Sequence, residues 1–450
     1  MVKHSSAVMH RSSRPNLATI ASGDGVYLID QQGNRFLDAC GGAAVSCLGH
    51  SNERVKQAII DQVNKVPYAH TSFFTNEPQE QLAEHLLQHA YGDFSQVYFV
   101  MGGSEAIETS LKLTRQYFLE VGKPEKKLFI TRKQSYHGNT LGALAIGGNL
   151  WRRKPFDPLL VDGHYISSCY EYRDRQEDEN EFQYGQRIAN ELETKILSLG
   201  AENVAAFVAE TVGGATAGCP TAPIGYFKRI REICDQYDVL LILDEIMCGM
   251  GRTGTLHACE QEGVQADIET IAKGIGAGYQ GLGAVLINDK IVDAIDQGSG
   301  FFQHGHTYIG HPSSCAAGLA TQLEIQERNL LSNVQVQGDN LKKALQTAFD
   351  ADTLLSDHIG DIRGRGLFIG IELVAKRQTK QPFDASLKLH ANIKKQAMKN
   401  HLMTYPMGGT IDGIQGDHVL LAPPFIITEE HVQQITQRLS KSIKSAIEAT

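Results

Sequence analysis

An aspartate and a lysine each follow an apolar stretch in the middle of the chain. Asp244 ends the run Val239–Leu243, and Lys273 follows Ile271-Ala272 and opens a glycine-rich loop. A lysine that is partly buried near other cations has a lowered pKa, and its neutral amine can form a Schiff base with a carbonyl compound. The interval between the two residues leaves room for one more strand and helix, so both side chains can face one crevice. Either residue alone is more often a simple strand-end or helix-end residue.

A glycine pair and a serine follow another apolar run. Gly102-Gly103-Ser104 comes directly after Val97–Met101 and opens a helical segment. Free backbone N–H groups, a serine hydroxyl and a helix N-terminus together make a binding site for a phosphate group. Because many helices begin with a serine that binds no ligand, this signal is weak when it stands alone.

Two further loops carry aromatic and histidine side chains. Tyr136-His137-Gly138 offers a ring that can stack on a flat heteroaromatic ligand, although a packed tyrosine beside a hydrogen-bonded histidine fits equally well. The loop from His304 to His311 holds three histidines without a set of carboxylates at regular spacing. We therefore expect no metal site.

The segment Gly249–Gly254 matches the G-x-G-x-x-G pattern of dinucleotide-binding proteins. Such a pattern should follow its strand directly and open a helix. Here Asp244-Glu245 and three more residues intervene, and Thr253-Gly254-Thr255 is a poor helix start. An NAD-dependent dehydrogenase is therefore only a distant alternative.

The composition predicts a large folded protein. Of the 450 residues, 42% are hydrophobic and 21% charged, which suits a sizeable core and not a disordered chain. The net charge of −9 argues against a nucleic-acid partner, which would require clustered positive charge. No apolar run approaches the roughly 20 residues that span a bilayer, and residues 1–14 lack the apolar segment of a signal peptide. Eight scattered cysteines without a C-x-x-C pair predict reduced thiols, so we expect a cytoplasmic protein with no membrane partner.

Short apolar runs alternate with longer helical segments through the middle of the chain, which predicts a mostly parallel sheet with helices on both faces. Residues 24–38 predict a hairpin, and an apolar stripe after Thr428 predicts a terminal helix. We expect an α/β fold with a large domain at 66–327 and a smaller α+β domain built from 1–65 and 328–450. The runs expected to be buried parallel strands are 97–101, 128–131, 204–209, 239–243 and 284–287.

The order of these features along the chain is more specific than any one of them. The glycine-serine pair, Tyr-His-Gly, a strand-end Glu210, Asp244, Lys273 and a later Gly-His-Thr307 together resemble the class III aminotransferases, which are pyridoxal-phosphate enzymes of fold type I. The resemblance runs from Gly23–Asp38 to Leu421–Pro424. It implies pyridoxal 5′-phosphate as cofactor and a homodimer with shared active sites.

The resemblance also implies roles for single residues. Lys273 is similar to the lysine that forms the Schiff base and moves the substrate's proton, and Asp244 is similar to the partner of the pyridine nitrogen. Thr307 is similar to the threonine that reaches the phosphate group of the neighbouring subunit's cofactor. The other implied cofactor contacts are Gly103 and Ser104 at the phosphate group, Tyr136 and Ile246 on the two ring faces, His137 in the same loop as Tyr136, and Glu210 near the ring hydroxyl.

The sequence departs from the family where substrates bind. Met247-Cys248 replaces a Gln-Thr pair of many members and is similar to the ω-amino acid and ω-amine:pyruvate branch. Tyr405 stands where that branch often has an arginine, and Leu420-Leu421 stands where other branches have one. Because arginine binds carboxylates best, Arg153 or its neighbour Arg152 becomes the candidate for that role. The other pocket residues implied are an aromatic pair, Phe73 and Phe74, and Ala44, which stands where some members have a bulky tryptophan.

The expected function is transfer of an amino group from an ω-amino acid or amine to a small 2-oxo acid, with pyruvate as the expected acceptor. A racemase, an aminomutase or a decarboxylating enzyme on the same scaffold is the alternative. The same cofactor residues serve all of these reactions, because the pose of the substrate selects the bond that breaks.

Overall fold

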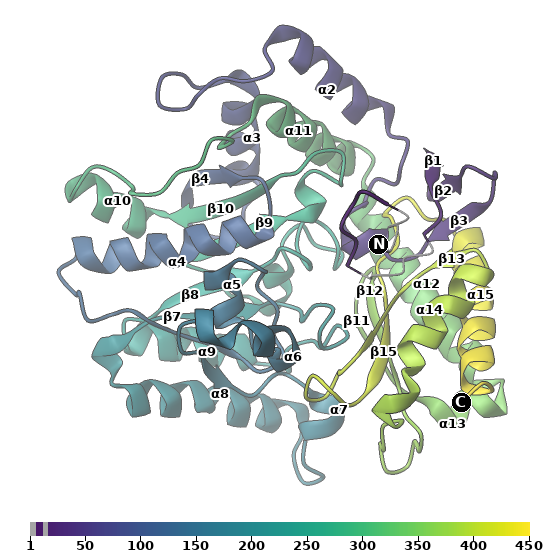
Figure 1. The fold of residues 1–450 in the computed structure, drawn as a ribbon. Coiled ribbons are helices and arrows are strands. Elements are labelled where there is room, and N and C mark those ends of the chain that lie inside the picture. The colour runs from purple at the N-terminus through teal and green to yellow at the C-terminus, as the bar shows by residue number, and fades with distance from the viewer. Residues whose placement is uncertain (1–5, 12–16) are drawn as a thin grey trace, which may run out of the picture.

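The structure, a computed structural model, describes residues 6–11 and 17–450, and a seven-stranded sheet forms its centre (Figure 1). The strand order is β4-β10-β9-β8-β7-β5-β6. Neighbouring strands from β6 to β9 run parallel, whereas β10 runs antiparallel to both β9 and β4. The strands are β4 (Phe94–Val100), β5 (Leu128–Arg132), β6 (His164–Ile166), β7 (Val204–Glu210), β8 (Leu240–Asp244), β9 (Ile268–Ala272) and β10 (Gly283–Asn288).

The mostly parallel sheet confirms the prediction, but the parallel direction expected for residues 284–287 is wrong. Residues 273–282 join β9 to β10 and contain a single 3-10 turn, Lys273–Ile275, with no crossover helix. A parallel connection needs a crossover of a dozen or more residues, so the chain returns antiparallel. The connecting loop, which begins at Lys273, therefore lies at the same sheet edge as Asp244.

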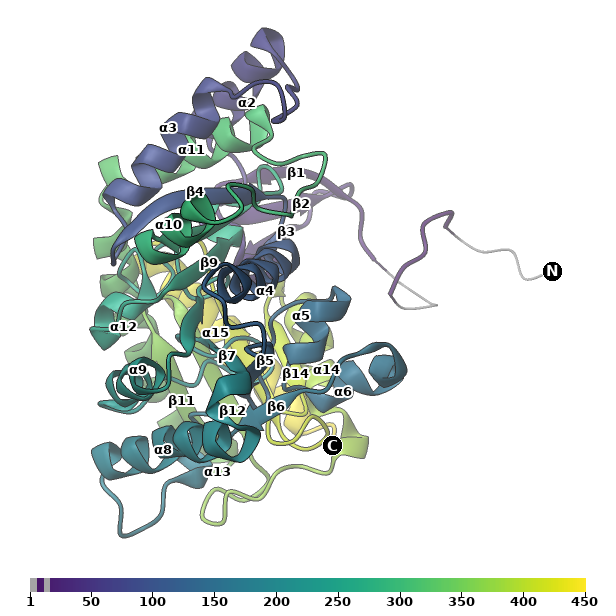
Figure 2. The same ribbon diagram turned by 90° about the vertical axis from the view of Figure 1, so that its left-hand side faces the viewer.

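Helices cover both faces of this sheet. Leu240 and Ile242 of β8 pack in the core with α4, α5 and α10, while Leu241 and Leu243 pack in the core with α8 and α9. This alternation follows from the two-residue period of a strand, and Figure 2 shows the two helix layers on opposite sides. The covering helices are α4 (Gly103–Glu120), α5 (Leu141–Ile146), α8 (Glu181–Leu199), α9 (Tyr226–Gln236) and α10 (Asp289–Gln297), with α3 (Glu77–Gln88) and α11 (Pro312–Glu327) beside β4 and β10.

Two four-stranded sheets bring the ends of the chain together. One has the order β1-β2-β3-β13, with β13 parallel to β3, and the other has the order β11-β12-β15-β14. Leu37, Leu402 and Leu439 belong to one core, so both ends contribute to it. These strands are β1 (Ile20–Asp24), β2 (Tyr27–Asp30), β3 (Arg35–Asp38), β11 (Ile359–Arg365), β12 (Phe368–Leu373), β13 (Leu402–Met403), β14 (Tyr405–Gly408) and β15 (Asp417–Leu421).

The remaining helices connect the sheets or pack on the smaller ones. The expected hairpin is β2-β3, and the expected terminal helix is α15, whose N-cap is Thr428. In the described part of the chain, no helix is long and apolar enough to cross a membrane. These helices are α1 (Gly41–Ala44), α2 (Glu53–Lys65), α6 (Leu150–Arg153), α7 (Glu171–Asp174), α12 (Leu330–Asp350), α13 (Thr353–His358), α14 (Leu389–Lys399) and α15 (Glu429–Ile447).

Candidate active site

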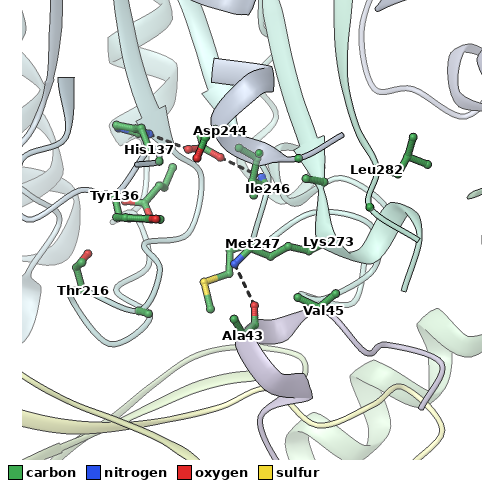
Figure 3. Close-up of a pocket in the computed structure, with 18 of the residues that line it drawn as sticks. Ala43, Val45, Tyr136, His137, Thr216, Asp244, Ile246, Met247, Lys273 and Leu282 are labelled. Carbon is green, nitrogen blue, oxygen red and sulfur yellow. Dashed lines mark hydrogen bonds and ion pairs between the residues drawn. The ribbon is translucent and has the colours of Figure 1, made fainter. Parts of the chain in front are cut away.

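The carboxyl ends of the parallel strands open into a cavity of about 370 Å³ (Figure 3). This volume lies within the roughly 300–1,000 Å³ typical of small-molecule sites, and such edges of parallel sheets commonly bind ligands. The predicted site residues that line the cavity are Gly103, Ser104, Tyr136, His137, Glu210, Asp244, Ile246, Lys273 and Tyr405.

Lys273 follows the end of β9, and its amine points into the cavity (Figure 3). Its Nζ donates a hydrogen bond to the carbonyl oxygen of Ala43 at 3.0 Å. Burial lowers the pKa of Lys273, although Asp244 and Glu210 act in the opposite direction. The backbone at Lys273 is left-handed, with φ of 49°, which costs a non-glycine residue roughly 1–2 kcal/mol. Such strained backbone is concentrated at functional sites.

Asp244 ends β8, and two partners hold its buried carboxylate. Its Oδ2 lies 2.7 Å from Nδ1 of His137, and its Oδ1 accepts a hydrogen bond from the N–H of Ile246 at 3.0 Å (Figure 3). His137 comes from the loop after β5 and is also buried. Its Nε2 is buried and has no hydrogen-bond partner within the described part of the chain. The pair therefore holds a carboxylate in one orientation at the cavity wall.

The N-terminus of α4 forms another part of the cavity wall. Gly102, not Ser104, is the N-cap, and the helix begins at Gly103. A Cβ at Gly103 would lie 2.8 Å from Cγ2 of Ile246, so only glycine lets these two segments approach so closely. Ser104 Oγ donates to Asn139 Oδ1 at 2.8 Å and accepts from the N–H of Asn139 at 3.0 Å. The free N–H groups of this turn suit a phosphate group.

Glu210 and Tyr136 complete the wall between β7 and the loop after β5. Glu210 Oε1 accepts a hydrogen bond from the N–H of Gly214 at 2.9 Å, and its Oε2 accepts one from the N–H of Tyr136 at 3.4 Å. Burial raises the pKa of both Glu210 and Tyr136.

This donor set fits pyridoxal 5′-phosphate, the cofactor that the resemblance implies. A partly buried amine, a buried carboxylate and a helix N-terminus line one cavity, and they match an aldehyde, a pyridine nitrogen and a phosphate group. The carboxylate ends β8, and the amine belongs to the residue directly after β9, the parallel neighbour of β8. Tyr136 and Ile246 add an aromatic and an aliphatic surface for the ring.

Two residues predicted to contact the substrate do not line this cavity. Arg153 is buried and donates from Nη1 to the carbonyl oxygens of Ala145 and Gly147, so its guanidinium fixes a turn. Arg153 therefore does not line the cavity, whereas its neighbour Arg152 does. Ala44 is buried in a separate apolar core, while the residues on either side of it, Ala43 and Val45, line the cavity.

Three other predicted residues lie on the surface of the chain, outside the cavity lining. The side chains of Phe73 and Phe74 are 77% and 67% exposed. Thr307 is exposed as well, and its carbonyl oxygen accepts a hydrogen bond from the Tyr68 hydroxyl at 2.9 Å. None of the three touches the site of its own chain, so their predicted roles require a second subunit.

A buried cluster of charged side chains next to β8 and β9 was not predicted from the sequence. Glu245, His257 and Glu269 are fully buried, and one polar atom of each lies within 4.8 Å of the others. His257 Nδ1 is 2.5 Å from Glu269 Oε1, and Glu245 accepts hydrogen bonds from the N–H groups of Ala258 and Cys259. Such a cluster is hard to predict from sequence, because glutamates are mostly exposed and these three residues are separated along the chain.

Comparisons with known proteins agree with this geometry. The family described as aminotransferase class-III matches residues 8–443. An uncharacterised aminotransferase of Schizosaccharomyces pombe is 44% identical over 432 residues, which cover 96% of this chain and 93% of that protein. The diaminobutyrate–2-oxoglutarate transaminase of Halomonas elongata is 34% identical, over 96% of this chain and 91% of that protein. The omega transaminase of Pseudomonas jessenii, solved in complex with PMP, superposes with a TM-score of 0.89 at 33% identity, covering 96% of this chain and 93% of the other.

Proposed function

The chain belongs to the class III aminotransferases, enzymes that use pyridoxal 5′-phosphate, and we propose that it moves an amino group from an ω-amino acid or amine to a small 2-oxo acid, with pyruvate as the expected acceptor. The observation that carries the proposal is the convergence of Lys273, Asp244 and the α4 N-terminus on one cavity. We further propose that the enzyme is a homodimer with shared active sites, which would give the exposed Phe73, Phe74 and Thr307 a site to serve.

The proposed roles follow from the position of each group. When bound, the cofactor supplies an aldehyde that accepts the amino group and a ring that withdraws electrons from the amine-bearing carbon. Asp244, held by His137, keeps a proton on the ring nitrogen. Lys273 would hold the cofactor through its Nζ and, when released, would accept the proton of the amine-bearing carbon on the same atom, a role that its lowered pKa suits. Gly103 and Ser104 bind the phosphate group.

Residues of the cavity lining support the proposed substrate class. Ala43, Val45 and Met247 give the cavity an apolar wall, and Tyr405 lines it at the position where the resemblance implies an arginine in the ω-amine branch. Leu420, at the other arginine position, is buried in an apolar core. An amine, or an amino acid with one carboxylate, suits this wall better than a dicarboxylate does.

Lys273→Ala removes the amine that lines the cavity. We expect this variant to lose the visible absorbance of the bound cofactor and to lose turnover by about 10²–10⁴-fold or more, because it lacks both the covalent tether and the general base. Absorbance spectra, borohydride trapping and alanine formation from pyruvate measure these effects. Lys154→Ala, which removes an exposed lysine outside the cavity, is the matched control. Undiminished turnover of Lys273→Ala would contradict the assignment.

A panel of substrates tests the reaction and its acceptor. The donors are β-alanine, 4-aminobutyrate, taurine, diamines and aryl amines, each paired with pyruvate and with 2-oxoglutarate. Alanine formed from pyruvate supports transamination, whereas inversion, isomerisation or carbon dioxide release without alanine supports the alternative reactions. A strong preference for 2-oxoglutarate would contradict pyruvate as the acceptor while leaving the reaction class intact.

A further inference from the structure

We propose that Arg152 is the residue that binds the substrate carboxylate, an inference that rests on the proposed function and names the specificity determinant of the same site. Arg152 lies on α6 and lines the cavity together with Lys273 and Tyr136.

The guanidinium of Arg152 has no anionic partner within the described part of the chain. Among residues 6–11 and 17–450, no salt bridge or side-chain hydrogen bond involves this guanidinium, and its Nε is buried without a partner. The carboxylates that line the cavity already have other partners, Glu210 at Gly214 and Asp244 at His137. A partly buried cation without an anion is unfavourable, so this site is electrostatically incomplete until an anion enters the cavity.

The surroundings hold Arg152 in place without using its charge. Its guanidinium carbon lies 4.7 Å from the ring centroid of Tyr136 and 5.9 Å from that of Trp151. Stacking of this kind orients the planar guanidinium and leaves its N–H groups free for a bidentate contact with a carboxylate.

The turn that carries Arg152 is itself anchored. The Asn149 side chain accepts a hydrogen bond from the backbone N–H of Arg152 at 3.2 Å and donates to Gln134 Oε1 at 2.9 Å. The buried Arg153 ties the same turn to carbonyl oxygens of α5 and its C-cap. A second guanidinium in the cavity lining is that of Arg11, on the exposed segment 6–11; among the residues that the structure describes, the hydrogen bonds of this segment are internal to it. We therefore assign the carboxylate to Arg152.

A pair of donors isolates the contribution of the carboxylate. Holoenzyme is mixed with β-alanine or with propylamine in the absence of a 2-oxo acid, and the loss of cofactor absorbance gives the rate of the first half-reaction. In Arg152→Gln we expect the β-alanine concentration for half-maximal rate to rise about 10–100-fold, because a charge-assisted pair is lost, while the propylamine value stays within about twofold. Lys154→Gln removes the same charge from the adjacent exposed position and serves as the control.

A binding measurement separates failure of this inference from failure of the proposed function. Propionate carries the carboxylate but no amine, so calorimetric titration of the holoenzyme with propionate needs no turnover. Binding to the wild type that is at least about tenfold weaker in Arg152→Gln supports the assignment even if neither amine reacts. Equal propionate affinity in both proteins overturns it. Equal losses for β-alanine and propylamine, together with weaker cofactor binding, also overturn it, because Arg152 would then serve the cofactor.

Discussion

At the scale of single residues, the buried cluster of Glu245, His257 and Glu269 makes stability depend on pH. Burial opposes a charge on His257, but Glu269 at 2.5 Å outweighs burial and raises the pKa of His257 to about 9. Burial also raises the pKa of Glu245 to about 7. Both pKa values lie above those of the unfolded chain, so both groups bind protons more tightly in the folded state, and stability falls as pH rises.

The predicted loss of stability falls in a defined pH range. The contribution of His257 is fully present below its unfolded pKa of about 6.5 and is lost as pH rises through about 9, which amounts to about 3 kcal/mol. We expect the melting temperature to fall between about pH 6 and about pH 9.5, and to fall less in the double variant His257→Phe/Glu269→Leu. His257→Phe alone should cost about 3–5 kcal/mol, because it leaves Glu269 buried without its partner. If the melting temperature fell equally with pH in the wild type and in the double variant, this explanation would be refuted.

Some of the residues that line the cavity could be predicted from the sequence, and others could not. Lys273 and Asp244 could be named in advance, because each combines a charged group with the end of an apolar strand, and the structure brings both to one cavity. Arg152 and Arg153 could not be told apart, because adjacent arginines in one short helix differ only in the direction of their side chains. The turn sends Arg153 inward to backbone carbonyls and Arg152 into the cavity, a difference that tertiary contacts decide.

At the scale of elements, the loop after β5 packs closely against the N-terminus of α4, and this packing requires a glycine at position 138. Gly138 has φ of 141°, and a Cβ there would lie 2.7 Å from Ser104 Oγ and 2.9 Å from Ala143 Cβ. We expect Gly138→Ala to move Ser104, to weaken cofactor binding about tenfold, and to destabilise the fold by about 1–3 kcal/mol. Cofactor titration and thermal unfolding measure these effects. Gly122→Ala, whose Cβ would also stand at a positive φ (73°) but would meet no atom within 4 Å, lies outside the cavity lining and is the control; an equal loss of cofactor affinity in both variants would contradict this explanation.

Elements were predictable where the sequence was uniformly apolar. β7 and β8 are wholly buried, and their runs were clear in the sequence. β9 was not singled out as a strand, because Glu269 and Thr270 interrupt its apolar run. Glu269 is tolerated inside the sheet only because His257, from the segment between β8 and β9, supplies its partner. The direction of β10 was missed because an apolar run carries no sign of direction.

At the scale of the whole molecule, Phe73, Phe74 and Thr307 lie outside the cavity lining of their own subunit. The two phenylalanines are exposed to an extent unusual for apolar side chains of this size, and Tyr308 beside Thr307 is 53% exposed. A two-fold symmetric dimer uses the same patch on both subunits, so residues of one chain can complete the site of the other. A dimer with shared sites could be predicted from the sequence only through the family resemblance, because composition and periodicity describe a single chain.

Mixed dimers test whether Thr307 serves the partner's site. We expect Thr307→Ala to weaken cofactor binding and Lys273→Ala to abolish turnover, each in a homodimer whose two sites are equally affected. In a hybrid of these two subunits, the Thr307→Ala chain keeps Lys273 and would receive an intact Thr307 from its partner, so one site of the two would be complete. When equal amounts of the two variants exchange subunits at random, half of the dimers are hybrids, and we therefore expect about one quarter of wild-type activity at limiting cofactor. If Thr307 acted within its own chain, no hybrid would contain a complete site, and mixing would restore nothing beyond the average of the two variants. Light scattering of the mixture must show a dimer throughout, because a monomer with full activity would remove the basis for shared sites.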